Sequence, residues 1–306
     1  MSITEREGIR NTFNKSLQGR ILVIGATGNV GRHVVSQLLN IGNEVCAMVF
    51  DPGAADLHDD VEVMRGDLAD PDIMEGCLAG IEAVFLDWPY DRRAGRFLAA
   101  ESAPAVVDAV ARHACRIVFI SSHGVRDDIE RSNVPATASY TGLERLIERS
   151  GLEWTFLRLC MPASITLNWA AQIRADGIVR GPYAASARSL IHERDVAAVA
   201  IRALVGDGHC GAKYLLTGAE SLTHTEQVRI IGEAIGRQLH YVEIPREAAR
   251  EALLTSWPPS LADSVLDAMA ARVTEPELIT RAVEEITGAP PRTFREWVDE
   301  HIDHFR

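Results

Sequence analysis

A glycine-rich run at residues 25–31 (GATGNVG) constrains the fold of this chain more than any other feature of its sequence. It directly follows a short apolar stretch typical of a buried strand, and it opens an amphipathic stretch typical of a helix. In such a turn Gly25 permits the tight bend, Gly28 lets a diphosphate approach the backbone, and Gly31 lets the helix pack closely on the strand. The free N–H groups at the start of the helix attract an anion. The run therefore predicts a strand, turn and helix that bind a dinucleotide.

Short apolar runs alternate with amphipathic stretches through the first half of the chain. The runs are apolar along their whole length, which is typical of strands buried on both faces, and the helices between them favour parallel pairing through right-handed crossovers. We therefore predict an α/β fold with a doubly wound parallel sheet and a smaller, mostly helical C-terminal region. The predicted strands are 20–25, 44–50, 61–64, 82–86, 116–121 and 153–159, and the predicted helices are 30–39, 71–79, 97–113 and 140–150, the last ending at Gly151.

The alternation loosens after Cys160. Thr223 and Glu226 match a capping box at the start of a helix that runs to residue 235. Other predicted elements are strands at 189–191, 213–217 and 239–244 and helices at 168–175 and 194–205. We predict an N-terminal extension (1–19), a dinucleotide-binding domain (20–160, with 188–236 returning to it) and a substrate-binding region (161–187 and 237–306).

Charge and composition exclude several classes of partner. The formal net charge is −12, with 43 acidic against 31 basic residues and no basic run, so nucleic acid is not an expected partner. No stretch approaches the ~18 apolar residues of a membrane span. Residues 1–19 are polar and lack the apolar core of a signal peptide, so we expect a cytoplasmic protein. The five cysteines are scattered and predict neither a disulfide framework nor a metal site.

Several segments resemble the NmrA-like group of atypical, extended short-chain dehydrogenases. They are the glycine run with Arg32, the turn Gly66-Asp67-Leu68, the pair Ser121-Ser122, residues 150–158 (SGLEWTFLR), residues 192–197 (HERDVA) and the pair Leu222-Thr223. The resemblance covers residues 19–245 and implies a Rossmann fold that binds NAD(P)(H), with the substrate held between the carboxyl edge of the sheet and the smaller region. The family includes quinone and enone reductases, and also regulators that sense dinucleotides without turnover.

The motif and the resemblance together predict the residues that contact the cofactor. Trp88 follows the fourth strand beside the expected path of the nicotinamide ribose, Ser121 follows the fifth strand, and Met161 follows the sixth strand, where it would frame the nicotinamide. The predicted cofactor-binding residues are Gly25, Thr27, Gly28, Asn29, Val30, Gly31, Phe50, Asp51, Asp67, Leu68, Trp88, Ser121 and Met161.

The end of the second strand bears on the choice between NAD(H) and NADP(H). An acidic residue there binds the ribose 2′-OH of NAD, whereas an Arg accommodates the phosphate of NADP. Relatives often carry Arg at the position of Phe50, and Asp51 follows it. A phosphate beside Asp51 would be repelled, so we lean to NAD(H). The alternatives are that Asp51 only shapes a turn before Pro52 and that Arg32 reaches a 2′-phosphate.

The usual proton relay of short-chain dehydrogenases is absent from this sequence. No Tyr-x-x-x-Lys pair occurs, and Tyr140, the best-placed tyrosine, is followed by Glu144, to which we assign a structural role. Ser122 and His123, directly after the fifth strand, are candidates to deliver a proton. The predicted catalytic residues are therefore Ser122, His123 and Tyr140. We interpret Cys160, His192 and Asp195 as structural residues.

These patterns predict an NAD(P)H-dependent oxidoreductase that reduces a small apolar carbonyl, enone or quinone by direct hydride transfer. One alternative is an NmrA-like dinucleotide sensor without turnover, and another is a non-redox enzyme of the epimerase or isomerase kind. The expected partner is a small-molecule substrate, and the sequence leaves open a homodimer or a protein partner.

Overall fold

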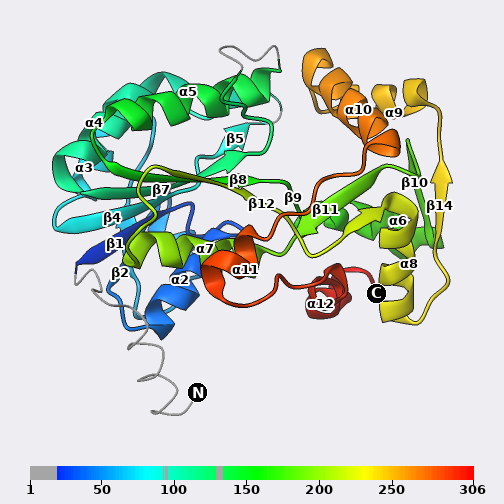
Figure 1. The fold of residues 1–306 in the computed structure, drawn as a ribbon, viewed down its shortest axis with the longest axis horizontal. Helices are drawn as coiled ribbons and strands as arrows, with labels where there is room; N and C mark the ends of the chain where they lie inside the picture. The colour runs from blue at the N-terminus through cyan, green and yellow to red at the C-terminus, as the bar shows by residue number, and fades with distance from the viewer. Residues whose placement is uncertain (1–18, 92, 94–95, 129–133) are drawn as a thin grey trace.

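The computed structural model describes residues 19–91, 93, 96–128 and 134–306, and its centre is a seven-stranded sheet in which every neighbouring pair is parallel (Figure 1). In spatial order the strands are β12 (Ala212–Leu216), β8 (Glu153–Leu159), β7 (Arg116–Ser122), β4 (Ile81–Leu86), β1 (Arg20–Ile24), β2 (Val45–Val49) and β3 (Glu62–Arg65). The strand order reverses beside β1, which places a topological switch point between β1 and β4. The predicted doubly wound parallel sheet is confirmed.

Helices cover both faces of this sheet, which explains why its inner strands β1, β2, β4 and β7 are largely apolar. On β1, Ile21 and Val23 face the core beneath α2 (Gly31–Asn40), α7 (Glu193–Val205) and α11 (Ala282–Thr287). Leu22 and Ile24 face the opposite core, beneath α3 (Pro71–Gly76), α4 (Ala103–His113) and α5 (Pro135–Arg149). Figure 1 shows these two helix layers on either side of the sheet. Successive side chains of an inner strand point to opposite faces of the sheet. Because helices cover both faces, nearly every position of such a strand is apolar.

A smaller lobe packs beside the carboxyl ends of the strands (Figure 1). Its own core surrounds the fully buried Trp297 and draws residues such as Leu190 and Ile231 from segments that we assign to the first domain. The predicted domain boundaries stay a prediction. The elements of this lobe are β9 (Met161–Pro162), β10 (Ile178–Gly181), β11 (Ala187–Ile191), β13 (Ser221–Thr223), β14 (His240–Glu243), α6 (Ala170–Asp176), α8 (His224–Ile235), α9 (Arg246–Leu254), α10 (Pro259–Thr274) and α12 (Phe294–Glu300).

Most predicted elements agree with the structure to within one or two residues, and the exceptions have local causes. The helix predicted over 97–113 begins only at Ala103, because Pro104 suits a first turn, where no N–H is needed. The residues before it form β6 (Arg96–Phe97), paired with β5 (Tyr90–Asp91). The helix predicted over 140–150 begins earlier, at Pro135, and ends before Gly151, which has the expected left-handed φ of 83°. The structure also confirms the capping box of Thr223 and Glu226.

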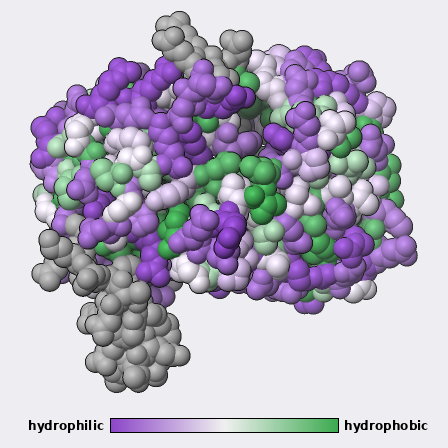
Figure 2. All heavy atoms as spheres, viewed as in Figure 1, coloured by the Kyte–Doolittle hydropathy of each residue, from purple (hydrophilic) through white to green (hydrophobic). Residues whose placement is uncertain are grey.

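Within the described residues, no helix is both long and apolar enough to cross a membrane. Figure 2 shows hydrophobic residues gathered near the middle of the face seen in Figure 1. Leu278 and Ile279, between α10 and α11, are among the exposed large hydrophobic residues of the chain. The predicted extension lies outside the described residues, except for Gly19.

Candidate functional site

The turn after β1 has the geometry that the glycine run predicts. Gly25 has a φ of +88°, a backbone conformation that side chains disfavour. A Cβ at Gly31 would lie 2.0 Å from the Gly25 carbonyl oxygen, and a Cβ at Gly28 would lie 3.1 Å from the same atom. Gly28 N–H donates to that oxygen at 2.9 Å. Only glycine fits at residue 31, and the bare backbone at residue 28 leaves a cradle where a diphosphate can approach.

The start of α2 supplies donors for an anion in this cradle. Within the described residues, no side chain caps the N-terminus of α2. The N–H groups of Arg32 and His33 donate to the carbonyl oxygens of Gly28 and Val30, so the Gly31 N–H, at the first position of the helix, is the one available to a ligand. Arg32 braces the turn, since its guanidinium donates to the carbonyl oxygens of Thr27 at 3.0 Å and Gly28 at 3.2 Å. The Asn29 amide donates to Ser164 Oγ at 3.1 Å, which ties the turn to the smaller lobe. Val30 is buried against the core. The residues present therefore fit a dinucleotide.

The ends of β2 and β3 place four predicted cofactor residues in different settings. Phe50 is 72% exposed. The Asp51 carboxylate accepts from Gly53 N–H at 3.0 Å and caps a short 3₁₀ helix, the turn role that we left open. The Asp67 carboxylate accepts from Ala69 N–H at 2.8 Å, and Leu68 is buried in the core. The structure thus brings Phe50, Asp51 and Asp67 to the carboxyl edge of the sheet, whereas the Leu68 side chain packs inward.

An aromatic cluster lies beyond the end of β4. Trp88 is 2% exposed, and its indole N–H donates to the Leu98 carbonyl oxygen at 2.7 Å. Tyr140, on α5, packs edge-on against Phe97 with ring centroids 4.8 Å apart and stacks on Tyr90 at 6.4 Å. Phe119 of β7 completes the cluster at 6.2 Å from Tyr140. Aromatic rings therefore surround Tyr140, and two of them, Phe97 and Phe119, belong to the buried core. The catalytic role of Tyr140 stays a prediction.

The end of β7 is anchored by a buried charge network. Ser121 is buried, and its hydroxyl donates to the Glu144 carboxylate at 2.5 Å. Glu144 is itself buried and accepts from the Arg158 guanidinium at 3.0 and 2.7 Å. Arg158 also donates to Asp127 at 2.8 and 3.2 Å, and these hydrogen bonds lower the pKa of Asp127 and raise that of Arg158. The network agrees with the structural role of Glu144 and occupies the Ser121 hydroxyl.

His123 is the predicted catalytic residue whose environment best suits proton transfer. Its ring Nδ1 lies 3.1 Å from the Leu159 carbonyl oxygen, which can only accept, so Nδ1 carries a hydrogen. Its Nε2 lies 3.8 Å from the carboxylate of the buried Glu277, and the side chain is 31% exposed. Burial lowers the pKa of His123, although Glu277 acts in the opposite direction. The neighbouring Ser122 hydroxyl accepts from Gly124 N–H at 3.2 Å within the same turn.

Glu277 joins His123 to the smaller lobe. The second oxygen of the Glu277 carboxylate accepts from the backbone N–H of Ser189 at 2.9 Å and from its hydroxyl at 3.2 Å, and the Arg188 guanidinium lies 3.3 Å from the first oxygen. Residue 277 lies far from residue 123 in the sequence, and nothing in the sequence pattern marks this pairing. Sequence reasoning therefore missed Glu277.

The remaining polar residues near this edge have structural surroundings. Burial raises the pKa of the Cys160 thiol to about 12, which makes it inert. Met161 pairs with Leu190 of β11. The His192 ring accepts from Arg194 N–H at 3.2 Å and caps α7, while Asp195 accepts from Arg292 N–H at 2.7 Å. These contacts agree with the structural interpretation of Cys160, His192 and Asp195.

A further acidic residue, Asp87, follows β4 at the centre of the edge and was not among the predicted site residues. Its backbone N–H donates to the Ile24 carbonyl oxygen at 3.1 Å. A Cβ at Gly28 would lie 3.7 Å from Asp87 Oδ2, so the carboxyl group borders the diphosphate cradle. Burial raises the pKa of Asp87 to about 6. The one sequence signal that could have identified Asp87 is an ionisable residue directly after the strand predicted over 82–86.

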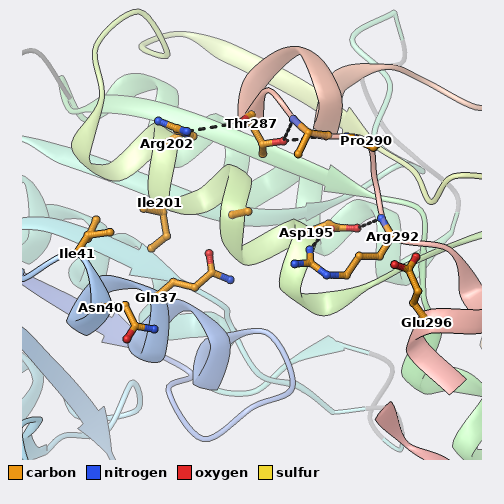
Figure 3. Close-up of a pocket in the computed structure, with 12 residues that line it drawn as sticks. Gln37, Asn40, Ile41, Asp195, Ile201, Arg202, Thr287, Pro290, Arg292 and Glu296 are labelled. Carbon is orange, nitrogen blue, oxygen red and sulfur yellow. Dashed lines mark hydrogen bonds and ion pairs between the residues drawn. The ribbon is translucent and has the colours of Figure 1, made fainter. Parts of the chain in front are cut away.

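A groove of about 530 Å³ lies elsewhere, between α2, α7 and the segment that leads into α12 (Figure 3). Figure 3 shows Arg292 directed at Asp195, and Arg202 beside the Thr287 carbonyl oxygen, at 3.5 Å. Helices rather than strand ends line the groove, and no predicted cofactor or catalytic residue is among its lining residues. Within the described part of the chain, no cluster of three or more His, Cys, Asp or Glu residues suits a metal ion. The candidate site is therefore the carboxyl edge of the sheet.

Two named reductases are similar to this chain along almost their whole length. The (4-alkanoyl-5-oxo-2,5-dihydrofuran-3-yl)methyl phosphate reductase of Streptomyces griseus is 35% identical over 289 residues, which cover 93% of this chain and 99% of the reductase. The NAD(P)H azoreductase of Xenophilus azovorans is 29% identical over 299 residues, again covering 93% of this chain and 99% of the relative. The model of the NmrA-like family matches residues 17–288.

A solved structure with the same fold is the triphenylmethane reductase of Citrobacter sp. It has a TM-score of 0.77 and 20% sequence identity, and the match covers 93% of this chain and 99% of that reductase. A second structure of that reductase is a complex with NADP(H) and has a TM-score of 0.75. At this identity the likeness supports the Rossmann-type architecture.

Proposed function

Since this chain belongs to the NmrA-like family, we propose that it is an NAD(P)H-dependent oxidoreductase that reduces a small, largely apolar carbonyl, enone or quinone. One observation carries the proposal. A glycine turn built for a diphosphate follows β1, and an acid–base side chain, His123, follows β7 at the same edge. Only β4 lies between these strands, so their ends are about 10 Å apart at an interstrand spacing of about 4.8 Å. Both groups therefore lie at the edge of the sheet beside the switch point, where ligands bind in this kind of fold.

The residues of the glycine turn and the Gly31 N–H at the start of α2 would hold the dinucleotide, which supplies a hydride when bound. Arg32 keeps the carbonyl oxygens of the turn occupied, so they do not face a phosphate unpaired. The bond between Asn29 and Ser164 couples the turn to the smaller lobe. These contacts keep the turn in one conformation before a ligand arrives.

His123 is the proton donor in this proposal. Because Nδ1–H is engaged by the Leu159 carbonyl oxygen, Nε2 is the atom that gains and loses a proton. Its lowered pKa keeps the ring mostly neutral at neutral pH, so Nε2 takes a proton from solution and passes it to the substrate oxygen. Glu277, beside Nε2, stabilises the protonated ring. Turnover should therefore slow as the pH rises.

The aromatic rings near the end of β7 favour a conjugated acceptor. Tyr90 and Tyr140 are half-buried and stacked on one another, and the buried Phe97 and Phe119 pack behind them. The two similar reductases are named for a furanone methyl phosphate and for azo compounds. Both names describe conjugated acceptors, and the first acceptor also carries a phosphate group. Reduction of such acceptors needs less acid assistance than reduction of a simple ketone, which suits a chain without a Tyr-x-x-x-Lys pair.

Loss of reduced-nicotinamide absorbance in the presence of quinone, butenolide and azo acceptors tests the proposal directly. We expect turnover by the wild type, and His123→Gln should lower kcat by roughly 100-fold or more while changing the Kd of NADH by less than about twofold. The matched control is His113→Gln, because His113 is exposed at the end of α4 and pairs with Glu75. Binding of NADH without turnover of any acceptor would favour a dinucleotide sensor instead.

The preference for NAD(H) depends on Phe50 and Asp51. With Asp51 capping its own turn and no arginine at residue 50, a 2′-phosphate has no cation from β2. We expect Phe50→Arg to tighten NADPH binding by about tenfold and to leave NADH binding nearly unchanged. Titration of both nucleotides against wild type and variant measures this. Unchanged NADPH affinity would contradict this account of the end of β2.

A further inference from the structure

The carboxyl group of Asp87 occupies an unusual position for a negative charge. Asp87 directly follows the central strand β4 and lies beneath the glycine turn. A Cβ at Gly25 would lie 2.9 Å from Asp87 Cβ, and a Cβ at Gly28 would lie 3.7 Å from Oδ2. The carboxyl oxygen therefore borders the space that the missing side chain of Gly28 leaves for a diphosphate. Two phosphate charges and an ionised carboxylate would repel one another there.

Among the described residues, no hydrogen bond or ion pair joins a cation to Asp87. The charged groups of the neighbouring elements are Arg32 in the first turn of α2 and the pair of Glu144 on α5 and Arg158 on β8. Arg32 donates to backbone carbonyl oxygens, and Arg158 donates to Glu144 and Asp127. The other charged groups after the neighbouring strands are Asp51, Asp67 and His123. Burial is the cause of the raised pKa of Asp87, about 6.

We propose that Asp87 binds the dinucleotide as the neutral carboxylic acid, its O–H directed at the diphosphate cradle, so that binding takes up one proton from solution. This inference rests on the proposed function, because it requires that the glycine turn holds a nicotinamide dinucleotide. The neutral acid is a donor at a site lined by donors, whereas the carboxylate is one more negative charge. Asp87 thus couples cofactor affinity to pH.

The expected size of the coupling follows from the ionisation of the free protein. At pH 7 about nine in ten molecules carry the Asp87 carboxylate, so binding should take up about 0.9 proton per dinucleotide. The apparent Kd should rise about 50-fold between pH 6 and pH 8, as the protonated fraction falls. Asp87→Asn keeps a donor without a titrating proton, so its Kd should lack this rise and its affinity at pH 8 should exceed that of the wild type.

Calorimetric titration of the full chain with NADH, in two buffers of different ionisation enthalpy at each pH from 6 to 8, counts the protons. NADH has no phosphate that titrates in this range. In a parallel titration with NADPH, the proton count of Asp87→Asn is subtracted from that of the wild type. This difference cancels the protons that come from the 2′-phosphate of NADPH and from any histidine. Asp72→Asn, which removes an exposed carboxylate from α3, is the control and should retain the wild-type proton count.

The outcomes separate this inference from the proposed function. Binding of NADH by the wild type without proton uptake overturns it. If Asp87→Asn then also binds more weakly at every pH, Asp87 is an ionised acceptor for a ribose hydroxyl. If neither nucleotide binds either protein at any pH, the proposed function fails, and this inference fails with it. A wild-type count near zero needs no variant, so it overturns the inference even if Asp87→Asn does not fold.

Discussion

Removal of the Glu144 carboxylate tests whether this residue supports the fold or acts in catalysis. Glu144 is 3% exposed and accepts hydrogen bonds from Ser121 and from two nitrogen atoms of Arg158. Loss of one partner from a buried ion pair typically costs about 3–5 kcal/mol, because the other charge is left buried. Arg158 would keep Asp127, whose side chain is 62% exposed and offsets only part of that loss. We therefore expect Glu144→Ala to lower the free energy of unfolding by about 3 kcal/mol.

Urea unfolding at pH 7 measures this loss, and thermal unfolding should show a Tm lower by about 5 °C. The matched control is Glu148→Ala, one helical turn along α5. Glu148 pairs with Lys213 at 2.9 Å, but the two side chains are 32% and 26% exposed, so its removal should cost less than about 1 kcal/mol. The double variant Glu144→Leu with Arg158→Leu should recover most of the loss, because it removes both buried charges.

A loss below about 1 kcal/mol for Glu144→Ala would refute the reasoning, since it would mean that the buried pair contributes no more than a surface pair. Normal stability combined with loss of turnover would instead place Glu144 in the chemistry. Both results are distinct from the expected one, in which stability falls and the Kd of NADH for the folded protein stays within about twofold of the wild type.

Two further predictions concern the glycine turn and acid stability. Gly31→Ala places a Cβ 2.0 Å from the Gly25 carbonyl oxygen, so we expect NADH affinity to fall by more than about 100-fold in a fluorescence titration. The control Gly142→Ala, on the open face of α5, should bind NADH normally. Normal binding by Gly31→Ala would contradict the role of the turn. Burial lowers the pKa of His192 to about 3 and of His224 to about 4. The unfolded chain therefore binds more protons than the folded protein below pH 6.5. The free energy of unfolding should fall by about 1.4 kcal/mol per pH unit for each ring between pH 6 and pH 4. Unfolding of His224→Asn across this range should show a shallower slope, and an unchanged slope would argue against a neutral buried His224.

Local sequence patterns determined the frame of this protein. The glycine run between a strand and a helix predicts the turn after β1, because each glycine is required by steric contacts with residues close to it in the sequence. Fully apolar runs predict a covered parallel sheet, and the capping box and Gly151 predict helix ends, for the same local reason. Where a boundary was wrong, as for the helix predicted from residue 97, pairing with another segment prevailed over composition.

Tertiary structure alone decided which side chains meet at the edge of the sheet. Glu277 lies beside His123, and Glu144 binds both Ser121 and Arg158. Asp87 lies beneath the glycine turn. No spacing in the sequence predicts these contacts. Their protonation depends on burial and on neighbouring charges, which are properties of the packed chain rather than of any one segment. The sequence therefore specified where a ligand can lie, and packing specified which groups can donate or accept a proton there.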